Sequence, residues 1–328
     1  MRIGILGSGT WGTAIANMLS NNGKKVTVYG KNAAEIDYLD KNRIHKHLPG
    51  CTLSPDIIFT NKIEEACVDK AIVVFAVPSV AMREVCQNAK PYLTKDTIIV
   101  TVAKGIEPDT LLTMSEIIND VLGNEFKVVA LSGPTHAEEV AIGQPTLIVS
   151  ACEDLKTAEF VQKVFYNDVL RVYTNQDIHA VELCGALKNI IALAAGMSDG
   201  MGFGDNAKAA IITRGLTEIT RLGRVIGGKY STFYGLTGIG DIVVTATSLH
   251  SRNHNAGYLL GQGKSLEETL EEVGMVVEGV NALVAAKQLS KKYQVEMPIV
   301  DAVYSVVYEG KNPRAAVSKL FSRKQISE

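Results

Sequence analysis

The sequence predicts an α/β fold in two parts: a doubly wound, mostly parallel sheet over residues 1–177 and an all-helical domain over residues 178–328. Short apolar runs alternate with helical stretches through the first half, as they do in sheets of this kind. A glycine-rich turn joins the first run to the first helix, and strand signals fade after about residue 177. The chain has 328 residues, a length that suits two domains.

The strands are predicted from apolar runs that are too short for helices. The run 71–77 is almost continuously apolar, as expected for a strand buried on both faces. For the last two runs an antiparallel direction stays open. The first helix is expected over Trp11 to Asn22, before Gly23. The predicted strands are 2–6, 25–29, 71–77, 97–102, 127–131, 146–150 and 170–173.

Helical periodicity dominates the second half of the chain. Glycine-rich segments at 200–204 and 235–240 are expected to be connections between helices. The predicted helices are 178–196, 206–226, 253–262, 265–273, 279–292 and 298–308.

Composition excludes several classes of function. The net charge of −2 gives no reason to expect nucleic acid or a membrane surface as a partner. Five cysteines without a CxxC pair fit reduced thiols rather than disulfides or a zinc site, so a cytoplasmic protein is expected. His250 and His254 have i, i+4 spacing but no apparent third ligand, and no metal is expected.

The segment Gly7–Gly12 reads GSGTWG, which is G-x-G-x-x-G, and it follows the first strand and opens a helix. That context is what gives the pattern its meaning. Glycines at 7, 9 and 12 allow a tight turn and a close approach of backbone to a pyrophosphate, which the helix N-terminus then attracts. The first domain is therefore predicted to be a Rossmann-type dinucleotide-binding domain.

The end of the second strand bears on the choice of nucleotide. An NAD site usually has Asp or Glu there for the ribose 2′-hydroxyl, whereas residues 28–32 read VYGKN. Lys31 could neutralise a 2′-phosphate, which favours NADP or the use of both nucleotides; alternatively, it is simply solvated. Pro78 and Ser79 follow a predicted strand and should lie near the nucleotide.

Lys188 lies in the run 178–196, which is otherwise nearly all small and apolar. It must either extend to water or be buried as a working cation. Burial would lower its pKa, because an apolar setting disfavours the charged form. A lysine of that kind can act as a general acid and base.

Other polar groups stand where apolar segments stop. Lys104 and the turn Gly133-Pro-Thr135 each follow a predicted strand, so both point to the same crevice if the sheet is parallel. Asp241 and Thr245 would share one face of a helix, where the carboxylate could orient a lysine; alternatively, Asp241 is an N-cap. The segment Ser251-Arg-Asn253 precedes a helix, and arginine beside a helix N-terminus suits a phosphate.

Taken in order, these motifs closely resemble those of the bacterial NAD(P)-dependent sn-glycerol-3-phosphate dehydrogenases. The resemblance covers nearly the whole chain. It rests on GSGTWGTA at 7–14, AKGIE at 103–107, GPTHAEE at 133–139, ELCGALKN at 182–189, Gly240-Asp241, Ser251-Arg-Asn253 and Val277-Glu-Gly279.

The resemblance implies reversible reduction of dihydroxyacetone phosphate to sn-glycerol 3-phosphate for glycerophospholipid synthesis, with Lys188 as the acid and base. Asn189 is expected to be a hydrogen-bonding partner in the substrate pocket. The implied substrate contacts are Lys104, Gly133, Thr135, Lys188, Asp241, Ser251, Arg252 and Asn253. The implied nucleotide contacts are Thr10, Trp11, Lys31, His47, Lys104, Ala137, Arg252, Val276 and Glu278.

The chain departs from the family at position 47, where an aromatic residue is frequent and His47 stands here. Two other functions stay open: a dehydrogenase of the β-hydroxyacid or 6-phosphogluconate type, which would act on a carboxylate, and a non-catalytic nucleotide sensor. A homodimer is expected.

Overall fold

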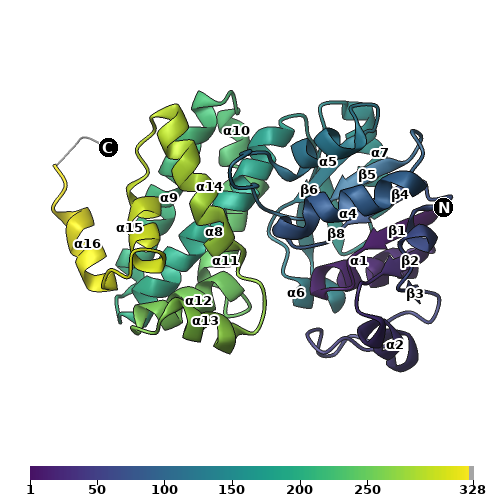
Figure 1. Cartoon of the computed structure of the whole chain (residues 1–328), viewed down its shortest axis with the longest axis horizontal. Helices are drawn as coiled ribbons and strands as arrows, with labels where there is room; N and C mark the ends of the chain where they lie inside the picture. The colour runs from purple at the N-terminus through teal and green to yellow at the C-terminus, as the bar shows by residue number, and fades with distance from the viewer. Residues whose placement is uncertain (325–328) are drawn as a thin grey trace. The chain divides into compact units, whose positions relative to one another are not determined.

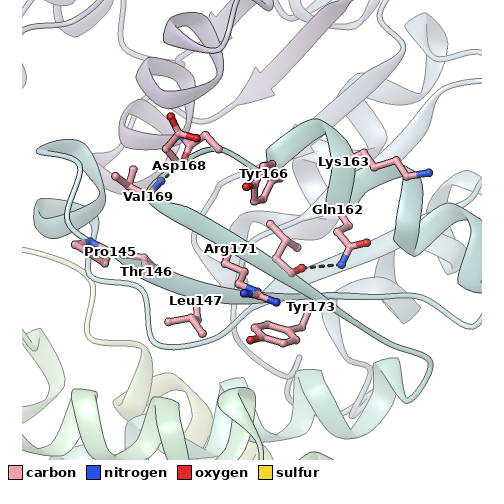
Figure 2. A pocket seen from close by; sticks show the side chains of 12 residues that line it. Pro145, Thr146, Leu147, Gln162, Lys163, Tyr166, Asp168, Val169, Arg171 and Tyr173 are labelled. Atoms are coloured by element: carbon pink, nitrogen blue, oxygen red, sulfur yellow. Dashed lines mark hydrogen bonds between the residues drawn. The ribbon is translucent and has the colours of Figure 1, made fainter.

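The computed structural model describes residues 1–324, and the chain divides into two compact units (Figure 1). The first comprises Met1–Lys104 and Leu112–Glu182. The second comprises Gly105–Leu111 and Leu183–Glu328. The α/β fold with a helical C-terminal region is thus as the sequence predicts.

An eight-stranded sheet forms the centre of the first unit, in the order β3-β2-β1-β4-β5-β6-β7-β8. Neighbouring strands are parallel from β3 to β6, β7 is antiparallel to β6, and β8 is parallel to β7. The strands are β1 (Arg2–Leu6), β2 (Lys25–Tyr29), β3 (Ile58–Thr60), β4 (Ile72–Phe75), β5 (Ile98–Thr101), β6 (Val128–Ser132), β7 (Thr146–Ala151) and β8 (Leu170–Asn175).

The sequence missed only β3 among the described strands. It has three residues, lies at the edge of the sheet, and leaves Ile58 58% exposed. Such a strand has too few residues for a periodic signal. By contrast, all four residues of β4 are buried, as its continuous apolar run predicts.

Helices cover both faces of the sheet. One core cluster joins the sheet to residues of α1, α6 and α7, and another joins it to residues of α3, α4 and α5. The helical elements of this unit are α1 (Thr10–Asn21), α2 (Ala33–Asn42), α3 (Ile63–Cys67), η1 (Ser79–Ala81), α4 (Met82–Ala89), η2 (Lys90–Tyr92), α5 (Met114–Leu122), α6 (Ala137–Ala141) and α7 (Leu155–Phe165).

All regular elements described in the second unit are helices, and most of the long helix α8 belongs to it. By length and composition α8 could cross a membrane, but its apolar window is entirely buried inside the protein, as in a core helix. The helices are α8 (Ile178–Gly200), α9 (Asp205–Val225), α10 (Tyr230–Phe233), η3 (Leu236–Gly240), α11 (Asp241–Thr247), α12 (Arg252–Gly261), α13 (Leu266–Val273), α14 (Glu278–Tyr293), α15 (Pro298–Val307) and α16 (Pro313–Phe321).

Helices α8 and α12 pack backbone against backbone through glycines on both sides. A Cβ added at Gly196 would lie 2.0 Å from the His254 carbonyl oxygen. One added at Gly257 would lie 2.1 Å from the Leu193 carbonyl oxygen. Neither oxygen can move aside without disturbing its helix. This close contact therefore fixes the spacing of the two helices.

Replacing Gly257 with alanine should lower the free energy of unfolding by about 1–3 kcal/mol, because the new methyl group overpacks the contact with α8. Denaturant unfolding measures this change. Gly204→Ala, at the N-cap of α9, is a control for the added methyl group alone, since no atom lies within 4 Å of its added Cβ. Equal stability of the Gly257→Ala variant and the parent chain would contradict the packing argument.

Two buried glutamates each stabilise the start of a helix that is distant in sequence. Glu182 accepts hydrogen bonds from the backbone N–H and the hydroxyl of Ser115, in the first turn of α5. Glu218 accepts the backbone N–H groups of Ile299 at 2.7 Å and Val300 at 3.3 Å, in the first turn of α15. Burial nevertheless raises the pKa of Glu218 to about 7.

This pKa predicts a dependence of stability on pH. A folded-state pKa near 7, above the ordinary value of 4.5, contributes stability that is present below pH 4.5 and is lost as the pH rises through 7. Relative to Glu218→Gln, the parent should therefore lose about 3 kcal/mol of unfolding free energy across that range. Urea unfolding of both proteins at pH 4.5 and pH 8 tests this, and a constant difference would count against the assignment.

Candidate functional site

The predicted nucleotide residues of the first unit follow the carboxyl ends of parallel strands. In the register of the sheet, Leu6, Phe75 and Thr101 are aligned on β1, β4 and β5. Gly7, Pro78 and Lys104 come within three residues of these strand ends. Such an edge is where ligands bind in open α/β sheets.

The glycine-rich turn has the geometry that its sequence predicts. Gly7 has φ 122°, and a Cβ there would lie 2.3 Å from the Ala76 carbonyl oxygen. A Cβ at Gly12 would lie 2.2 Å from the Gly7 carbonyl oxygen, whereas Gly9 faces open space. The Thr10 hydroxyl is buried at the start of α1 without a hydrogen-bond partner. A tight turn, an open cradle and an unsatisfied hydroxyl fit a pyrophosphate at this helix N-terminus.

His45 supports this turn, and the sequence analysis missed it. It is 5% exposed and hydrogen-bonds to the backbone of Ser8, between the first two glycines. Its Nδ1 accepts the backbone N–H of His47 at 3.1 Å, which leaves Nε2 to donate. Burial lowers the pKa of His45 to about 4, so the ring is neutral at physiological pH. Residues 43–57 form a loop without periodicity, so no sequence pattern marks this histidine.

Lys31 is well exposed, but it is not simply solvated. Its Nζ lies 3.1 Å from Oε1 of Glu84 in α4. Pro78 is exposed and precedes η1, while Ser79 is buried. Half-buried Trp11 packs against the core beneath the glycine-rich turn, and half-buried His47 lies in the loop that also contains His45.

Lys104 lies beside the turn that follows β6. Its Nζ donates to the Gly133 carbonyl oxygen at 3.0 Å, and the Thr135 hydroxyl donates to the same oxygen at 3.1 Å. Ala137 begins α6 directly afterwards and is buried. The structure therefore brings Lys104, Gly133 and Thr135 together, as expected from two neighbouring strand ends.

In the second unit, Lys188 is buried with its charge paired. It is 7% exposed, and Asp241 is fully buried. The Lys188 ammonium donates to the Asp241 carboxylate and, at 2.7 Å, to the Thr245 hydroxyl. The interpretation of Lys188 as a surface lysine is therefore wrong. So is that of Asp241 as an N-cap, because Gly240 caps α11 and the Asp241 carboxylate binds Lys188.

A short π-helix presents Asp241 to Lys188. Residues 235–240 were expected to be a simple connection, but Leu236–Gly240 forms a π-helical turn that continues directly into α11. A Cβ at Gly238 would lie 1.8 Å from the Phe233 carbonyl oxygen. Glycines that look like a flexible linker therefore serve close packing. Asp241 and Thr245 do share one face of α11, since the Thr245 hydroxyl donates to the Asp241 carbonyl at 2.6 Å.

The start of α12 carries the predicted anion-binding residues. Ser251 is the N-cap, and its hydroxyl accepts the His254 backbone N–H at 3.2 Å. Arg252 is exposed, and its guanidinium donates to the Val276 carbonyl at 3.3 Å. His254 binds Asp199 of α8 at 2.8 Å through Nε2. This link between α8 and α12 was missed, because the two residues are 55 positions apart.

Two asparagine side chains connect α8, α12 and α14. Asn253 donates to the Asn189 Oδ1 at 3.0 Å and accepts the Gly279 backbone N–H at 2.8 Å. Asn189 in turn donates to the Gly185 carbonyl at 3.3 Å. Glu278 is the first residue of α14, and Val276, shortly before it, is 40% exposed. These hydrogen bonds connect the starts of α12 and α14 to the helix that carries Lys188.

Among the described residues, no group of three or more histidine, cysteine or acidic side chains could hold a metal ion. His250 and His254 in particular do not converge on a third ligand there.

Comparison with known proteins covers almost the whole chain. Residues 2–158 match the family model for the N-terminus of NAD-dependent glycerol-3-phosphate dehydrogenase, and residues 177–318 match that for its C-terminus. A glycerol-3-phosphate dehydrogenase [NAD(P)+] of Lactobacillus delbrueckii subsp. bulgaricus is 56% identical, over 100% of this chain and 98% of the relative. A glycerol-3-phosphate dehydrogenase [NAD(P)+] from Bacillus subtilis is 50% identical, over 100% of this chain and 96% of the relative.

Solved structures agree with the sequence comparison. The glycerol-3-phosphate dehydrogenase of Coxiella burnetii has a TM-score of 0.94 and 34% identity, over 98% of this chain and 99% of that one. A ketopantoate reductase from Ralstonia eutropha has a TM-score of 0.67 at 14% identity, which shows only a shared fold. Because both family models match and relatives align along its full length, this chain belongs to the NAD-dependent glycerol-3-phosphate dehydrogenase family.

Proposed function

We propose that this chain catalyses the reversible reduction of dihydroxyacetone phosphate to sn-glycerol 3-phosphate with NADPH or NADH. The observation that carries the proposal is the buried Lys188, with its ammonium held by Asp241 and Thr245. A buried lysine is costly unless it is paired, and such groups concentrate at functional sites. The family to which the chain belongs supports the choice of substrate.

Residues of the first unit would hold the nucleotide. The turn at Gly7, Gly9 and Gly12 with Thr10 would take the pyrophosphate, and Lys31 and Pro78 would lie at the adenosine end. Trp11, His47, Lys104 and Ala137 remain predicted contacts. When bound, the nicotinamide supplies the hydride or accepts it.

Lys188 would donate the proton in one direction and accept it in the other. As hydride adds to the carbonyl carbon, the electron pair of the C=O double bond moves to oxygen, and Lys188 Nζ gives that oxygen a proton. In the reverse direction neutral Lys188 takes the hydroxyl proton as hydride leaves carbon. Asp241 and Thr245 would aim the ammonium, and Asp241 would balance its charge while Lys188 is protonated.

The phosphate group of the substrate would bind at the start of α12. Arg252 is exposed there and begins the helix, where the backbone N–H groups and the helix dipole also favour an anion. Ser251 and Asn253 flank it, and their side chains already stabilise the turn. Arg252 would therefore supply the main charged contact.

The wider setting is proposed from the family alone. The product would serve glycerophospholipid synthesis in the cytoplasm, and the protein would work as a homodimer. The division into a nucleotide-binding domain (1–177) and a substrate-binding domain (178–328) likewise remains a prediction.

Following the absorbance of NADPH and NADH with dihydroxyacetone phosphate tests the activity directly. Turnover with a β-hydroxyacid instead, or with no ketone at all, would overturn the proposal.

Replacing Lys188 with methionine should reduce kcat by about 10²–10⁴-fold, because proton transfer by a positioned group is lost. Nucleotide binding, measured by calorimetry, should change little. Lys287→Met is the control, since Lys287 is another lysine of the second unit that is paired with an aspartate, Asp301. Near-normal turnover of the Lys188→Met protein would exclude Lys188 as the acid and base.

The Lys188→Met variant also leaves Asp241 buried without its main partner, which lowers the free energy of unfolding by about 3–5 kcal/mol. The double variant Lys188→Met with Asp241→Asn removes both charges and should recover most of that stability. It should still lack turnover, which separates loss of chemistry from loss of fold.

Replacing Arg252 with alanine should raise the KM for dihydroxyacetone phosphate by about ten- to hundredfold, since a charged contact to phosphate is lost. Steady-state kinetics measures this effect. Arg221→Ala is the control, because Arg221 is exposed and likewise donates to a backbone carbonyl, that of Glu296. An unchanged KM would rule out Arg252 as the phosphate ligand.

A further inference from the structure

The end of β2 lacks the carboxylate that usually selects NAD. In Rossmann folds, an acid at this point accepts the ribose 2′-hydroxyl of NAD, whereas a basic residue favours the 2′-phosphate of NADP. This chain has Gly30, Lys31 and Asn32 there. By sequence alone it offers a cation and no acid.

The structure supplies the missing acid from another element. Glu84 lies in the first turn of α4, 53 residues after Lys31, and its Oε1 is 3.1 Å from Lys31 Nζ. Helix α4 follows β4, which pairs with β1, and β1 pairs with β2. The crossover connections of the sheet thus bring a carboxylate to the end of β2 that no local pattern could reveal.

The neighbouring polar groups are already engaged. The Asn32 side chain caps α2 by accepting the N–H groups of Ala34 and Glu35. Arg83, next to Glu84, forms an ion pair with Asp120 of α5. The Lys31 and Glu84 side chains are 84% and 60% exposed, so both can be reached by a ligand.

We propose that Lys31 and Glu84 together set the nucleotide specificity, with Glu84 accepting the 2′-hydroxyl of NAD(H) and Lys31 pairing with the 2′-phosphate of NADP(H). The inference deepens the proposed function and rests on it, since it assumes a nicotinamide dinucleotide on this sheet edge. It names Glu84 as a specificity-determining residue.

The weakness of the ion pair is what would allow both nucleotides. Exposed pairs of this kind contribute about 0–1 kcal/mol, so a ligand can separate them at little cost. With a 2′-phosphate, attraction by Lys31 is partly cancelled by repulsion from Glu84. With a 2′-hydroxyl, Glu84 accepts a hydrogen bond from the nucleotide while the Lys31 ammonium stays nearby. Neither nucleotide is excluded, and neither is strongly preferred.

The test measures the dissociation constants of NADH and NADPH for the intact chain by titration calorimetry, without substrate. Glu84→Gln should weaken NADH binding about three- to tenfold, because a charged acceptor is lost. The same change should tighten NADPH binding about two- to fivefold at low salt, because a repulsive charge is removed. Lys31→Gln should weaken NADPH binding and leave NADH binding nearly unchanged.

Two comparisons separate the possible outcomes. Glu159→Gln makes the same change in net charge at an exposed position of α7, which connects β7 and β8 at the other end of the sheet, and should alter neither constant. The fragments 5′-AMP and 2′,5′-ADP should show the same preferences as the full nucleotides, because they differ only at the 2′ position. If Glu84→Gln changes the dissociation constants of NADH and NADPH by the same factor, or changes neither, the specificity role is overturned while the proposed function stands. If the parent chain binds neither nucleotide, both are overturned.

Discussion

The helical unit depends on one costly interaction, the buried ion pair between Lys188 and Asp241. Removing an ammonium from water is tolerable only when a carboxylate and further hydrogen bonds replace the solvent. Thr245 supplies one such bond to the same ammonium. The π-helical turn before Asp241 and the apolar length of α8 both serve to bring these groups together. A contact that is costly to bury is therefore also the one on which catalysis would depend.

Local sequence patterns predicted much of the fold because strands and helices are local structures. The buried run of β4 and the glycine-rich turn at Gly7 each carry their own signal. The pairing of Lys188 with Asp241 could be suggested only from residue types, because 53 residues separate them. His45 and Glu84 gave no signal at all, since one lies in an irregular loop and the other on the exposed face of an ordinary helix.

In the second unit, glycines that suggest flexibility by sequence instead allow close packing. Gly238 and its neighbours resemble a flexible linker, yet they form a tightly packed helical turn. Gly196 and Gly257 look like weak points within helices, yet each sits against a carbonyl of the facing helix. Whether a glycine permits bending or close packing depends on what lies opposite, which is decided by tertiary structure.

The glycine contact between α8 and α12 has a consequence for motion. Side chains that interdigitate can change rotamer and let helices slide, but two backbones in direct contact have no such freedom. The two helices must therefore travel as one rigid body. Any rearrangement that moves the start of α12, with Arg252, also carries Lys188 on α8. Lys188 and the start of α12 would then keep their separation through any motion of the helices around them.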